Sequence, residues 1–429
     1  MNGRILIITC VYPPEPVVSA RTSEEIADFL ASRSYLVDVV APYPSRPTGE
    51  YPKKFRGRFG PVCENNESSN LSVIRLRAFA SRKSTLLSRF LENLSFGILS
   101  FFIILVAGWR YSAVYVNTWP LMAVFLAIVP AKLWRLRVVR SVQDLYPSSL
   151  VSQSRVDKNS SALYALTKFE ALNYRLSTFN VFLSKEMRAQ YLETLGIGEL
   201  KDTSIVIPNW GRKVVELPQR GLQQTAANKA LDLNIGDGSL RDWCTGSRLL
   251  VFGGNISVSS GLERILSNIP DLEELKLKLL IAGSGSELQV CETIVQNRGL
   301  SKSVRFLSPW PKELTVPVLS CADVFLLPTL PGQSINSLPS KLLDYMGLER
   351  PVLCVADEGS TLKNLFDEQD IGFCTTDTSE DSLKAVLREV GFAGLIEMQE
   401  KGKHARAYMD QNLTSGKWLP VLESALVRY

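Results

Sequence analysis

Residues 336–346 of this chain are NSLPSKLLDYM, and this stretch decides how the rest of the sequence is interpreted. Ser337 and Pro339 stand where the start of a helix favours a capping oxygen and a residue with preset φ, ahead of apolar residues at helical spacing. A helix start offers unpaired backbone N–H groups, which can hold an anion such as a diphosphate. Lys341 would add a positive charge in the first turn, and Asp344 one turn later would accept from a ribose hydroxyl. An ordinary capped helix with a surface pair of Lys341 and Asp344 explains the same pattern.

The composition is that of a globular protein with more than one domain. A chain of 429 residues exceeds what one hydrophobic core usually supports, and 45% hydrophobic with 21% charged residues is a globular balance. The formal net charge of +5 is too small to indicate a nucleic-acid partner. His404 is the only histidine. The sequence therefore offers almost no residues for histidine metal sites or for Ser-His or Cys-His catalysis. Hydrolase chemistry is therefore disfavoured.

The cysteines and the first apolar run indicate a cytoplasmic protein. The seven cysteines are scattered and contain no C-x-x-C pair, which is typical of small core residues in a reduced compartment. They are Cys10, Cys63, Cys244, Cys291, Cys321, Cys354 and Cys374. The apolar run at residues 4–10 is far shorter than an export signal or a membrane span and is predicted as a buried strand.

An apolar segment between residues 90 and 109 departs from this ordinary soluble character. It contains about 14 residues without charge, fewer than the roughly 20 that a spanning helix needs. A second apolar run, residues 121–129, ends in the basic and aromatic stretch 132–137. Basic and aromatic residues beside short apolar helices suit a protein on an anionic leaflet, so 82–137 is a candidate for peripheral membrane contact. Two buried helices of the first domain would give the same pattern.

The first half alternates strand and helix patterns, which predicts a parallel, doubly wound α/β sheet. Residues 42–70 interrupt this alternation as a long Pro-rich loop with the basic cluster 53–58, and such loops are often functional. A polar, turn-rich stretch at 212–246 follows the last strand, so the first domain is predicted to span 1–208. Strands are expected at residues 4–10, 35–41, 71–79, 113–118, 137–142, 180–183 and 204–207.

The second half repeats the alternation and predicts a second parallel sheet, in a domain spanning 209–395 and followed by C-terminal helices at 396–429. Its strands are expected at residues 248–252, 277–281, 304–307, 323–327, 351–355 and 372–374. Ligands of such sheets bind outside the carboxyl ends of the strands. The loops that should therefore gather on one rim are 253–261, 283–287, 309–312 and 328–340.

Two glycine-rich turns stand at strand ends on this rim. Gly253, Gly254 and Asn255 precede a helix expected near Gly261, where the backbone could approach a phosphate closely. Residues 283–287, GSGSE, repeat the pattern after the next strand. Each turn alone is explained equally well by a tight connection. Together with residues 336–346 they make a better nucleotide site than any one turn.

Three polar side chains are candidates in the first half. Glu15 and Arg21 follow the first strand and could reach a sugar or phosphate, although a solvated loop and a helix-face arginine explain them as well. Asp144 stands at the carboxyl end of a strand, where a sugar-binding or catalytic carboxylate belongs, but aspartate also commonly caps a turn. No second carboxylate can be paired with Asp144 from spacing, so a glycosidase dyad is not predicted.

Six segments, in this order, resemble the bacterial branch of glycosyltransferase family 4, which includes colanic-acid, capsule and O-antigen transferases. They are YPPE at 12–15, QDLYP at 143–147, IPNW at 207–210, FGGNI at 252–256, AGSG at 282–285 and PSKLLDYM at 339–346. The resemblance covers nearly the whole chain. It implies a GT-B fold, in which two Rossmann-like domains face a cleft and the second holds the nucleotide-sugar. It also implies retaining, metal-independent transfer without a cofactor, and a last helix that crosses back to the first domain.

The chain departs from the family pattern at the donor site. Many members carry Glu, seven residues and Glu, where this chain has Asn336 and Asp344. Many also place Arg and Lys after the first strand of the second domain, where this chain has Asn255 and Ser260. Lys341 and backbone amides would then balance the diphosphate. A non-catalytic GT-B-fold binding protein in a polysaccharide assembly fits these losses, and a nucleotide-sugar epimerase would share the architecture.

The resemblance implies transfer of a hexose or N-acetylhexosamine from a nucleotide-sugar, expected to be UDP-linked, to a lipid-linked saccharide. This reaction would take place at the inner face of the cytoplasmic membrane. Lys341 and Asp144 are the expected catalytic residues, and Glu15 and Arg21 are expected to orient the acceptor. The expected donor-binding residues are Gly253, Gly254, Asn255, Ser260, Gly283, Glu287, Trp310, Asn336, Ser337, Ser340 and Asp344.

Overall fold

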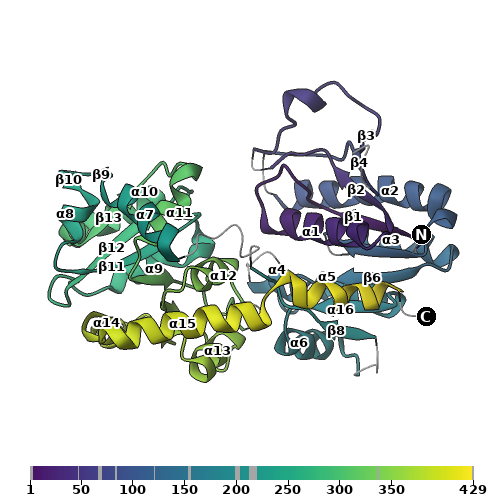
Figure 1. Cartoon of the computed structure of the whole chain (residues 1–429). Helices are drawn as coiled ribbons and strands as arrows, with labels where there is room; N and C mark the ends of the chain where they lie inside the picture. The colour runs from purple at the N-terminus through teal and green to yellow at the C-terminus, as the bar shows by residue number, and fades with distance from the viewer. Residues whose placement is uncertain are drawn as a thin grey trace. The chain divides into compact units, whose positions relative to one another are not determined.

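The computed structural model describes residues 3–46, 48–65, 70–82, 85–119, 121–152, 156–198, 203–211, 220–335 and 338–427. The chain divides into two compact units, each built around a sheet of its own (Figure 1). Unit 1 comprises Met1–Ile207 with Trp418–Tyr429, and unit 2 comprises Pro208–Lys417.

An eight-stranded sheet forms the centre of unit 1, in the order β3-β4-β2-β1-β5-β6-β7-β8. Neighbouring strands are parallel except β3 and β4, which are antiparallel. The strands are β1 (Arg4–Thr9), β2 (Leu36–Pro42), β3 (Val62–Asn65), β4 (Leu71–Leu76), β5 (Ala113–Asn117), β6 (Arg137–Ser141), β7 (Phe179–Phe182) and β8 (Ser204–Val206). The helices are α1 (Val18–Ser32), α2 (Leu86–Ala107), α3 (Met122–Leu133), α4 (Ser148–Ser152), α5 (Ser161–Leu176), α6 (Lys185–Leu195) and α16 (Ser415–Val427).

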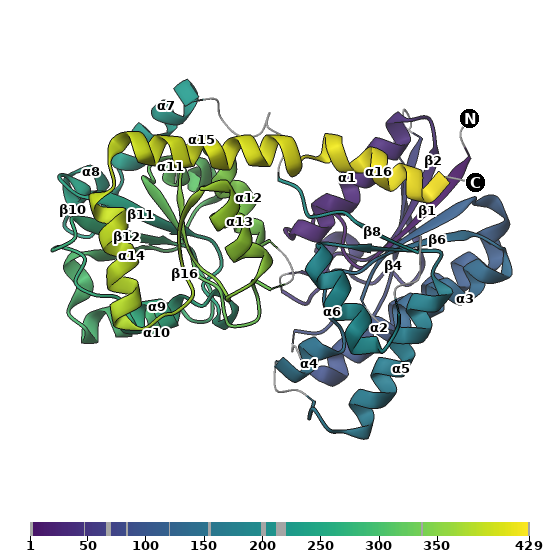
Figure 2. The same ribbon diagram turned by 90° about the horizontal axis from the view of Figure 1, so that it is seen from below.

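Helices cover both faces of this sheet, which is why its central strands are continuous apolar runs. Leu6 and Ile8 of β1 join a buried cluster with Phe96 of α2 and Ile128 of α3. Helices α1 and α16 lie on one face, and α2, α3 and α5 lie on the other (Figure 2). The guanidinium of Arg137, the first residue of β6, donates to the carbonyl oxygen of Ala425 at 2.6 Å. This bond holds α16 against the start of that strand.

Two stretches of unit 1 differ from the sequence-based expectation. Residues 42–70, expected as a loop, contain β3, so the sheet is not wholly parallel. Strand β3 includes exposed Cys63 and lacks the apolar run of a buried strand. Helix α2 has 22 residues rather than about 14, because a capping box between Thr85 and Ser88 starts it before the uncharged run.

Unit 2 contains a six-stranded parallel sheet in the order β13-β12-β11-β14-β15-β16. This is the order of doubly wound nucleotide-binding folds, whose ligands bind where the order reverses, here outside the carboxyl end of β11. The strands are β11 (Arg248–Gly253), β12 (Leu277–Ala282), β13 (Val304–Leu307), β14 (Val324–Leu327), β15 (Val352–Val355) and β16 (Gly372–Thr375). The helices are α7 (Arg220–Leu231), α8 (Leu240–Cys244), α9 (Leu262–Asn268), α10 (Leu288–Asn297), α11 (Thr315–Ser320), α12 (Ser340–Gly347), α13 (Thr361–Gln369), α14 (Glu380–Phe392) and α15 (Leu395–Asn412).

Two buried clusters, one on each face of this sheet, hold unit 2 together. Val251 of β11 packs in a cluster with α12, α13 and α15, whereas Phe252 packs in the opposite cluster with α9, α10 and α14 (Figure 2). Residues 212–246, expected as turns, instead include α7, α8 and the short strands β9 (Asn234–Ile235) and β10 (Gly238–Ser239). Helix α15, at the start of the expected C-terminal segment 396–429, is part of unit 2.

Candidate functional site

Glycines at the end of β11 leave the backbone open. A Cβ on Gly253 would lie 2.6 Å from the side chain of Leu319 and 3.0 Å from the indole of Trp310. Gly254 has φ +137°, which side chains rarely adopt, and a Cβ there would lie 2.6 Å from Cε of Lys341. The φ of Gly254 requires glycine, whereas at Gly253 the side chains of Leu319 and Trp310 would have to shift to admit a side chain.

The turn after β12 packs against the turn after β11. The Gly254 N–H donates to the Ala282 carbonyl at 2.9 Å, and the Ile256 N–H donates to the Ser284 carbonyl at 3.0 Å. A Cβ on Gly283 would overlap the carbonyl oxygen of Gly254. The two glycine turns expected on one rim thus lie side by side and form one backbone surface.

Helix α12 begins at Ser340 with Pro339 at its N-cap, and no described side chain caps it. Ser337, expected as the capping residue, lies outside the described residues together with Asn336. The helix starts three residues after Ser337, so the N-cap position belongs to Pro339 and not to the serine. Because no described side chain occupies the first-turn N–H groups, they are suited to receive an anion.

Lys341 occupies the first turn of α12, as expected, and its ammonium lies over an aromatic ring. Nζ is 3.8 Å from the ring centroid of Phe252. Burial lowers the pKa of Lys341 to about 8, because the charged form loses its hydration. Among the described residues Lys341 makes no hydrogen bond and no ion pair, so the surface pair with Asp344 is not formed. A half-buried, unpaired ammonium beside two glycine turns is a site for an anion.

Tyr345 fixes α12 to the end of β11, a role that no sequence pattern indicates. Its hydroxyl oxygen accepts from the Gly253 N–H at 3.1 Å, and the hydroxyl lies 3.3 Å from the Gly253 carbonyl oxygen. Its ring stacks on Phe325 of β14 with centroids 4.0 Å apart. Burial raises the pKa of Tyr345, so the phenol stays protonated and can donate. The sequence indicates a role for the neighbouring Asp344, whereas the role of Tyr345 is apparent only from its contacts with Gly253 and Phe325.

Asp357, also missed from the sequence, orders the loop that leads towards α12. Its carboxylate accepts from the Gly332 N–H at 2.9 Å, and the Ser334 hydroxyl donates to it at 2.6 Å. The Ser334 oxygen in turn accepts from the Asp357 N–H at 2.6 Å. The Thr361 hydroxyl donates to the Ile335 carbonyl at 2.8 Å. These bonds tie residues 332–335 to the turn after β15.

The other expected donor-binding residues are distributed around this rim. Asn255 is exposed, and Glu287 stands at the N-cap of α10. Ser260 is buried, and its hydroxyl donates to the Ser257 carbonyl at 2.7 Å, within its own turn. The indole N–H of Trp310 is buried without a hydrogen-bond partner in the described part of the chain. Contacts of these side chains with a ligand stay predictions.

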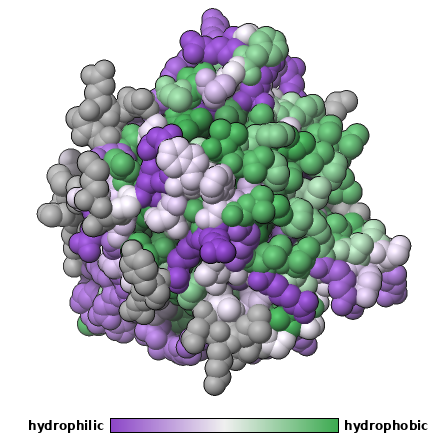
Figure 3. Space-filling model, turned by 90° about the vertical axis from the view of Figure 1, so that its right-hand side faces the viewer, coloured by the Kyte–Doolittle hydropathy of each residue, from purple (hydrophilic) through white to green (hydrophobic). Residues whose placement is uncertain are grey.

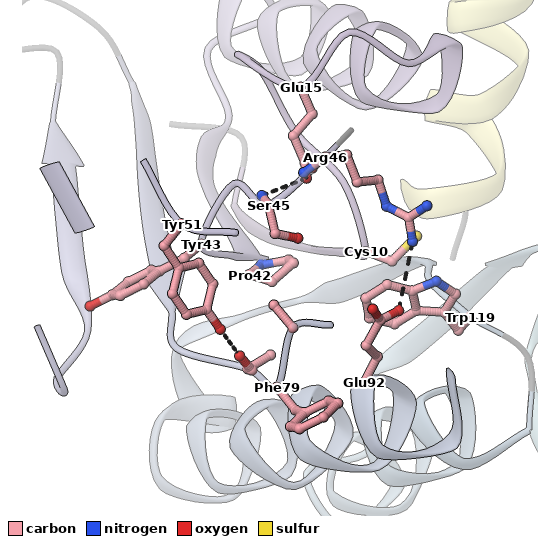
Figure 4. Close-up of a pocket in the computed structure, with 12 residues that line it drawn as sticks. Cys10, Glu15, Pro42, Tyr43, Ser45, Arg46, Tyr51, Phe79, Glu92 and Trp119 are labelled. Carbon is pink, nitrogen blue, oxygen red and sulfur yellow. Dashed lines mark hydrogen bonds and ion pairs between the residues drawn. The ribbon is translucent and has the colours of Figure 1, made fainter. Parts of the chain in front are cut away.

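Unit 1 has a small polar pocket of its own at the carboxyl ends of β1 and β2 (Figure 4). Glu15 is buried there, and its Oε1 accepts from the N–H groups of Ser45 and Arg46, both at 3.1 Å. Its other oxygen, Oε2, is buried without a described partner. The guanidinium of Arg46 lies 3.9 Å from Glu92 of α2 and 5.9 Å from the ring centroid of Trp119. A buried carboxylate oxygen without a described partner marks this pocket as a candidate polar site.

The two other candidates of unit 1 do not join this pocket. Arg21 lies 3.6 Å from Glu25 on the same helix, and neither residue lines the pocket. Asp144 is exposed in the loop after β6 and does not line the pocket either. No group of three or more His, Cys, Asp or Glu side chains with the spacing of a metal site occurs among the described residues of either unit.

Comparison with known families accounts for both halves of the chain. The family described as "Glycosyl transferase 4-like domain" matches residues 19–210, and "Glycosyl transferases group 1" matches residues 243–401. The chain belongs to the family 4 type of glycosyltransferases. This glycosyltransferase has the GT-B fold, with one Rossmann-like domain in each unit.

Similar proteins span the whole length of this glycosyltransferase. WcaI of Escherichia coli strain K12, named as a colanic acid biosynthesis glycosyl transferase, is 22% identical over 417 residues, which are 96% of each chain. Anabaena Alr3699/HepE in complex with UDP superposes with a TM-score of 0.67 at 12% identity, over 99% of this chain and 100% of that chain. Sucrose-phosphate synthase from Thermosynechococcus elongatus gives a TM-score of 0.70 at 13% identity, over 98% of both chains.

Proposed function

We propose that this glycosyltransferase moves a sugar from a UDP-linked donor to a lipid-linked saccharide in surface polysaccharide biosynthesis. The transfer retains the anomeric configuration and requires no metal. The observation that carries this proposal is the unpaired ammonium of Lys341 beside the glycine turns after β11 and β12.

A diphosphate suits the end of β11 for electrostatic reasons. The expected Arg and Lys of related donor sites are absent at Asn255 and Ser260, so Lys341 supplies the positive charge. The first N–H groups of α12 add donors. An anion bound there would stabilise the protonated form of Lys341, which burial destabilises.

The names of similar proteins support the choice of donor and pathway. Alr3699/HepE binds UDP, and WcaI is named for colanic acid biosynthesis. In this chain, Asp344 is proposed to hold the ribose, with Glu287 and Trp310 near the nucleoside. A hexose or N-acetylhexosamine is the proposed sugar.

Retention is proposed to proceed without a dedicated protein base. The bond from the sugar to the diphosphate breaks as the acceptor hydroxyl approaches the same face, and the leaving diphosphate takes the hydroxyl proton. Lys341 and the α12 amides stabilise the charge that develops on the leaving group. Asp144 is proposed to orient the donor sugar. Loss of transfer in Lys341→Ala with full transfer in Asp144→Ala would support the first role and exclude the second.

The acceptor saccharide is proposed to bind on unit 1 at the mouth of this pocket, which itself has room for little more than a water molecule. Glu15 would position the backbone of Ser45 and Arg46 there, and the ring of Trp119 offers an apolar face. Arg21, which lies near Glu25, would serve at the margin of this site. Glu15→Gln keeps the shape of the side chain and should raise the KM for the acceptor without changing UDP binding.

The test is a calorimetric and thermal-shift panel of UDP, GDP, dTDP and their sugars. We compare wild type with Lys341→Met and with Lys384→Met, in which the substituted lysine is exposed on α14. Binding of UDP that weakens at least tenfold in Lys341→Met alone supports the donor site. No binding by folded wild-type protein supports a non-catalytic GT-B binding protein instead. Conversion of the donor sugar without any acceptor would indicate an epimerase. The anomeric configuration of the product, followed by NMR, tests retention.

A further inference from the structure

Helix α2 presents an apolar surface to its surroundings. All of its exposed residues are large and apolar, and they recur at spacings that place most of them on one side of the helix. We call them the α2 stripe: Leu86, Leu87, Phe90, Ile98, Phe102 and Val106. Exposed Trp109 follows directly after the helix. A helix of 22 residues is about 33 Å long. The stripe is therefore a continuous apolar surface and not the single scattered apolar residues that an ordinary protein surface carries.

Three polar residues of α2 are buried while the exposed residues of the helix are apolar, which reverses the usual pattern of a surface helix. Ser88, Glu92 and Ser100 are all buried. Glu92 is 2.7 Å from Arg89, and the Ser100 hydroxyl donates to the Phe96 carbonyl at 2.9 Å. A helix whose polar side chains are satisfied inside while its apolar side chains face outward requires an apolar environment outside.

Neighbouring helices extend the apolar surface. Leu133 and Trp134 at the end of α3 are exposed, as are Tyr164 and Leu172 of α5. The indole N–H of Trp134 donates to the Leu105 carbonyl at 3.0 Å, which ties the end of α3 to α2. Figure 3 shows a broad hydrophobic area on the side of unit 1 where α2, α3 and α5 lie, with hydrophilic side chains around it.

The charges of this helical layer have one sign at the surface. The only acidic residues in α2, α3 and α5 are Glu92 and Glu170, which are buried and paired with Arg89 and Arg140. The exposed charged residues of these helices and of the turns that follow α2 and α3 are all basic: Arg110, Lys132, Arg135, Lys168 and Arg175. An apolar surface with basic and aromatic residues at its margin is complementary to an anionic lipid surface.

One side of α2 is packed against unit 1, which argues against a helix that crosses the membrane. By length and mean hydropathy, residues Leu86–Arg110 could span a membrane, and 28% of the apolar window is buried inside unit 1. However, Phe96 and Ile104 are fully buried in the sheet core. A Cβ on Gly97 would lie 2.9 Å from Cα of Ala123, so α3 covers the inner side of α2 along its middle. One side of α2 is committed to the protein, which leaves only the other for lipid.

We propose that unit 1 docks on an anionic leaflet with α2 parallel to the membrane plane and the α2 stripe among the acyl chains. The same helix contributes Glu92 to the pocket of unit 1, and the Phe79 N–H beside that pocket donates to Ser95 Oγ of α2 at 2.8 Å. A saccharide bound at the mouth of this pocket would therefore lie at the lipid interface. This last step rests on the proposed function, whereas lipid docking itself does not.

The experiment is flotation of the full chain with vesicles of phosphatidylglycerol and phosphatidylcholine, against vesicles of phosphatidylcholine alone. The test variant is Phe102→Glu with Val106→Glu, at positions that are 56% and 73% exposed. The matched control is Phe392→Glu with Ile396→Glu in unit 2, at positions that are 59% and 77% exposed. Wild type and control should float with the anionic vesicles, and the test variant should lose at least tenfold in partitioning.

A second variant tests the basic margin. Lys132→Gln with Arg135→Gln should weaken partitioning to anionic vesicles by about fivefold for each charge removed. Far-UV circular dichroism and UDP calorimetry check that each variant is folded. Absence of wild-type flotation, or equal flotation of the stripe variant, overturns the proposal. So does a dimer in light scattering that the stripe variant dissociates, since a second copy would then cover the stripe. Flotation without UDP binding would uphold the lipid surface and refute the proposed donor.

Discussion

The ammonium of Lys341 lies 3.8 Å from the ring centroid of Phe252, one residue before the glycines that end β11. The aromatic face partly compensates the charge, but burial still lowers the pKa of Lys341 to about 8. A cation in this position favours binding of an anionic ligand, because the ligand provides a counter-charge that the described residues do not.

Nucleotide affinity should depend on the protonation of Lys341. Only the protonated form supplies a charge to the diphosphate, so UDP affinity in the wild type should be steady near pH 7 and fall progressively above about pH 8. Lys341→Arg stays charged and should flatten the profile, while Lys341→Met should bind weakly at every pH. Calorimetry between pH 6.5 and about 9.5 measures this. A wild-type profile as flat as that of the arginine variant would contradict the assignment.

The same lysine should give a distinct stability signature in the absence of ligand. Its pKa in the folded protein, about 8, lies below the ordinary 10.5, so the unfolded chain binds more protons between these values. The contribution of Lys341 to the free energy of unfolding therefore rises with pH across that window. Lys341→Met lacks this dependence, so its stability relative to wild type should be higher at pH 7 than at about pH 10. Urea unfolding at both values, with Lys384→Met as the control, provides the comparison.

Gly283→Ala should disrupt the donor site through the backbone alone. The added Cβ would overlap the Gly254 carbonyl oxygen, so the two glycine turns would have to separate. We expect at least a tenfold loss of UDP affinity and a loss of about 1–3 kcal/mol in the free energy of unfolding. Gly238→Ala is the matched control, because nothing lies within 4 Å of a Cβ there. UDP binding by Gly283→Ala equal to that of the control would show that this contact does not shape the site.

Asp357 should act on donor binding through the loop that it holds. Asp357→Ala removes acceptors for the Gly332 N–H and the Ser334 hydroxyl, each hydrogen bond to a charged group being worth about 1.5–3 kcal/mol at most. The loop before α12 should loosen, and the KM for the donor should rise more than kcat falls. Hydrogen exchange of residues 330–335 gives a readout that a merely global loss of stability would not reproduce. Unchanged exchange in this loop would rule out the positioning role.

The sequence predicted the elements whose signal is local. The parallel strands of both sheets, the glycine turns and the place of Lys341 in the first turn of a helix follow from apolar runs and turn residues. Strand β3 escaped prediction because an exposed edge strand needs no apolar run. Helix α2 is longer than the uncharged run of about 14 residues because a capping box between Thr85 and Ser88 starts it before that run.

The contacts that complete the site come from residues far apart in the chain. Tyr345 reaches Gly253 across 92 positions, and Asp357 reaches Ser334 across 23. Neither pairing has a periodic or compositional signature, so only the tertiary arrangement shows it. The pocket of unit 1 is similar. Glu15 was a candidate from the sequence, but its backbone partners at Ser45 and Arg46 lie 30 and 31 positions away, and Arg46 in turn lies near Glu92 of α2.

A buried ionic network should govern the stability of unit 1. Arg140 of β6 and Glu170 of α5 are 2% and 1% exposed and form an ion pair. The Tyr191 hydroxyl donates to Glu170 at 2.8 Å and accepts from Arg140 at 2.9 Å. Removing one charge leaves the other buried without compensation, so Glu170→Ala should lower the free energy of unfolding by about 3–5 kcal/mol.

The double variant Arg140→Met with Glu170→Leu separates the two parts of this effect. It removes both charges and keeps most of the apolar volume, so it should recover most of the loss caused by Glu170→Ala. Urea unfolding followed by circular dichroism measures all three proteins, and UDP calorimetry verifies that unit 2 is intact. A double variant as unstable as Glu170→Ala would mean that the hydrogen bonds of Tyr191, rather than the uncompensated guanidinium, set the cost.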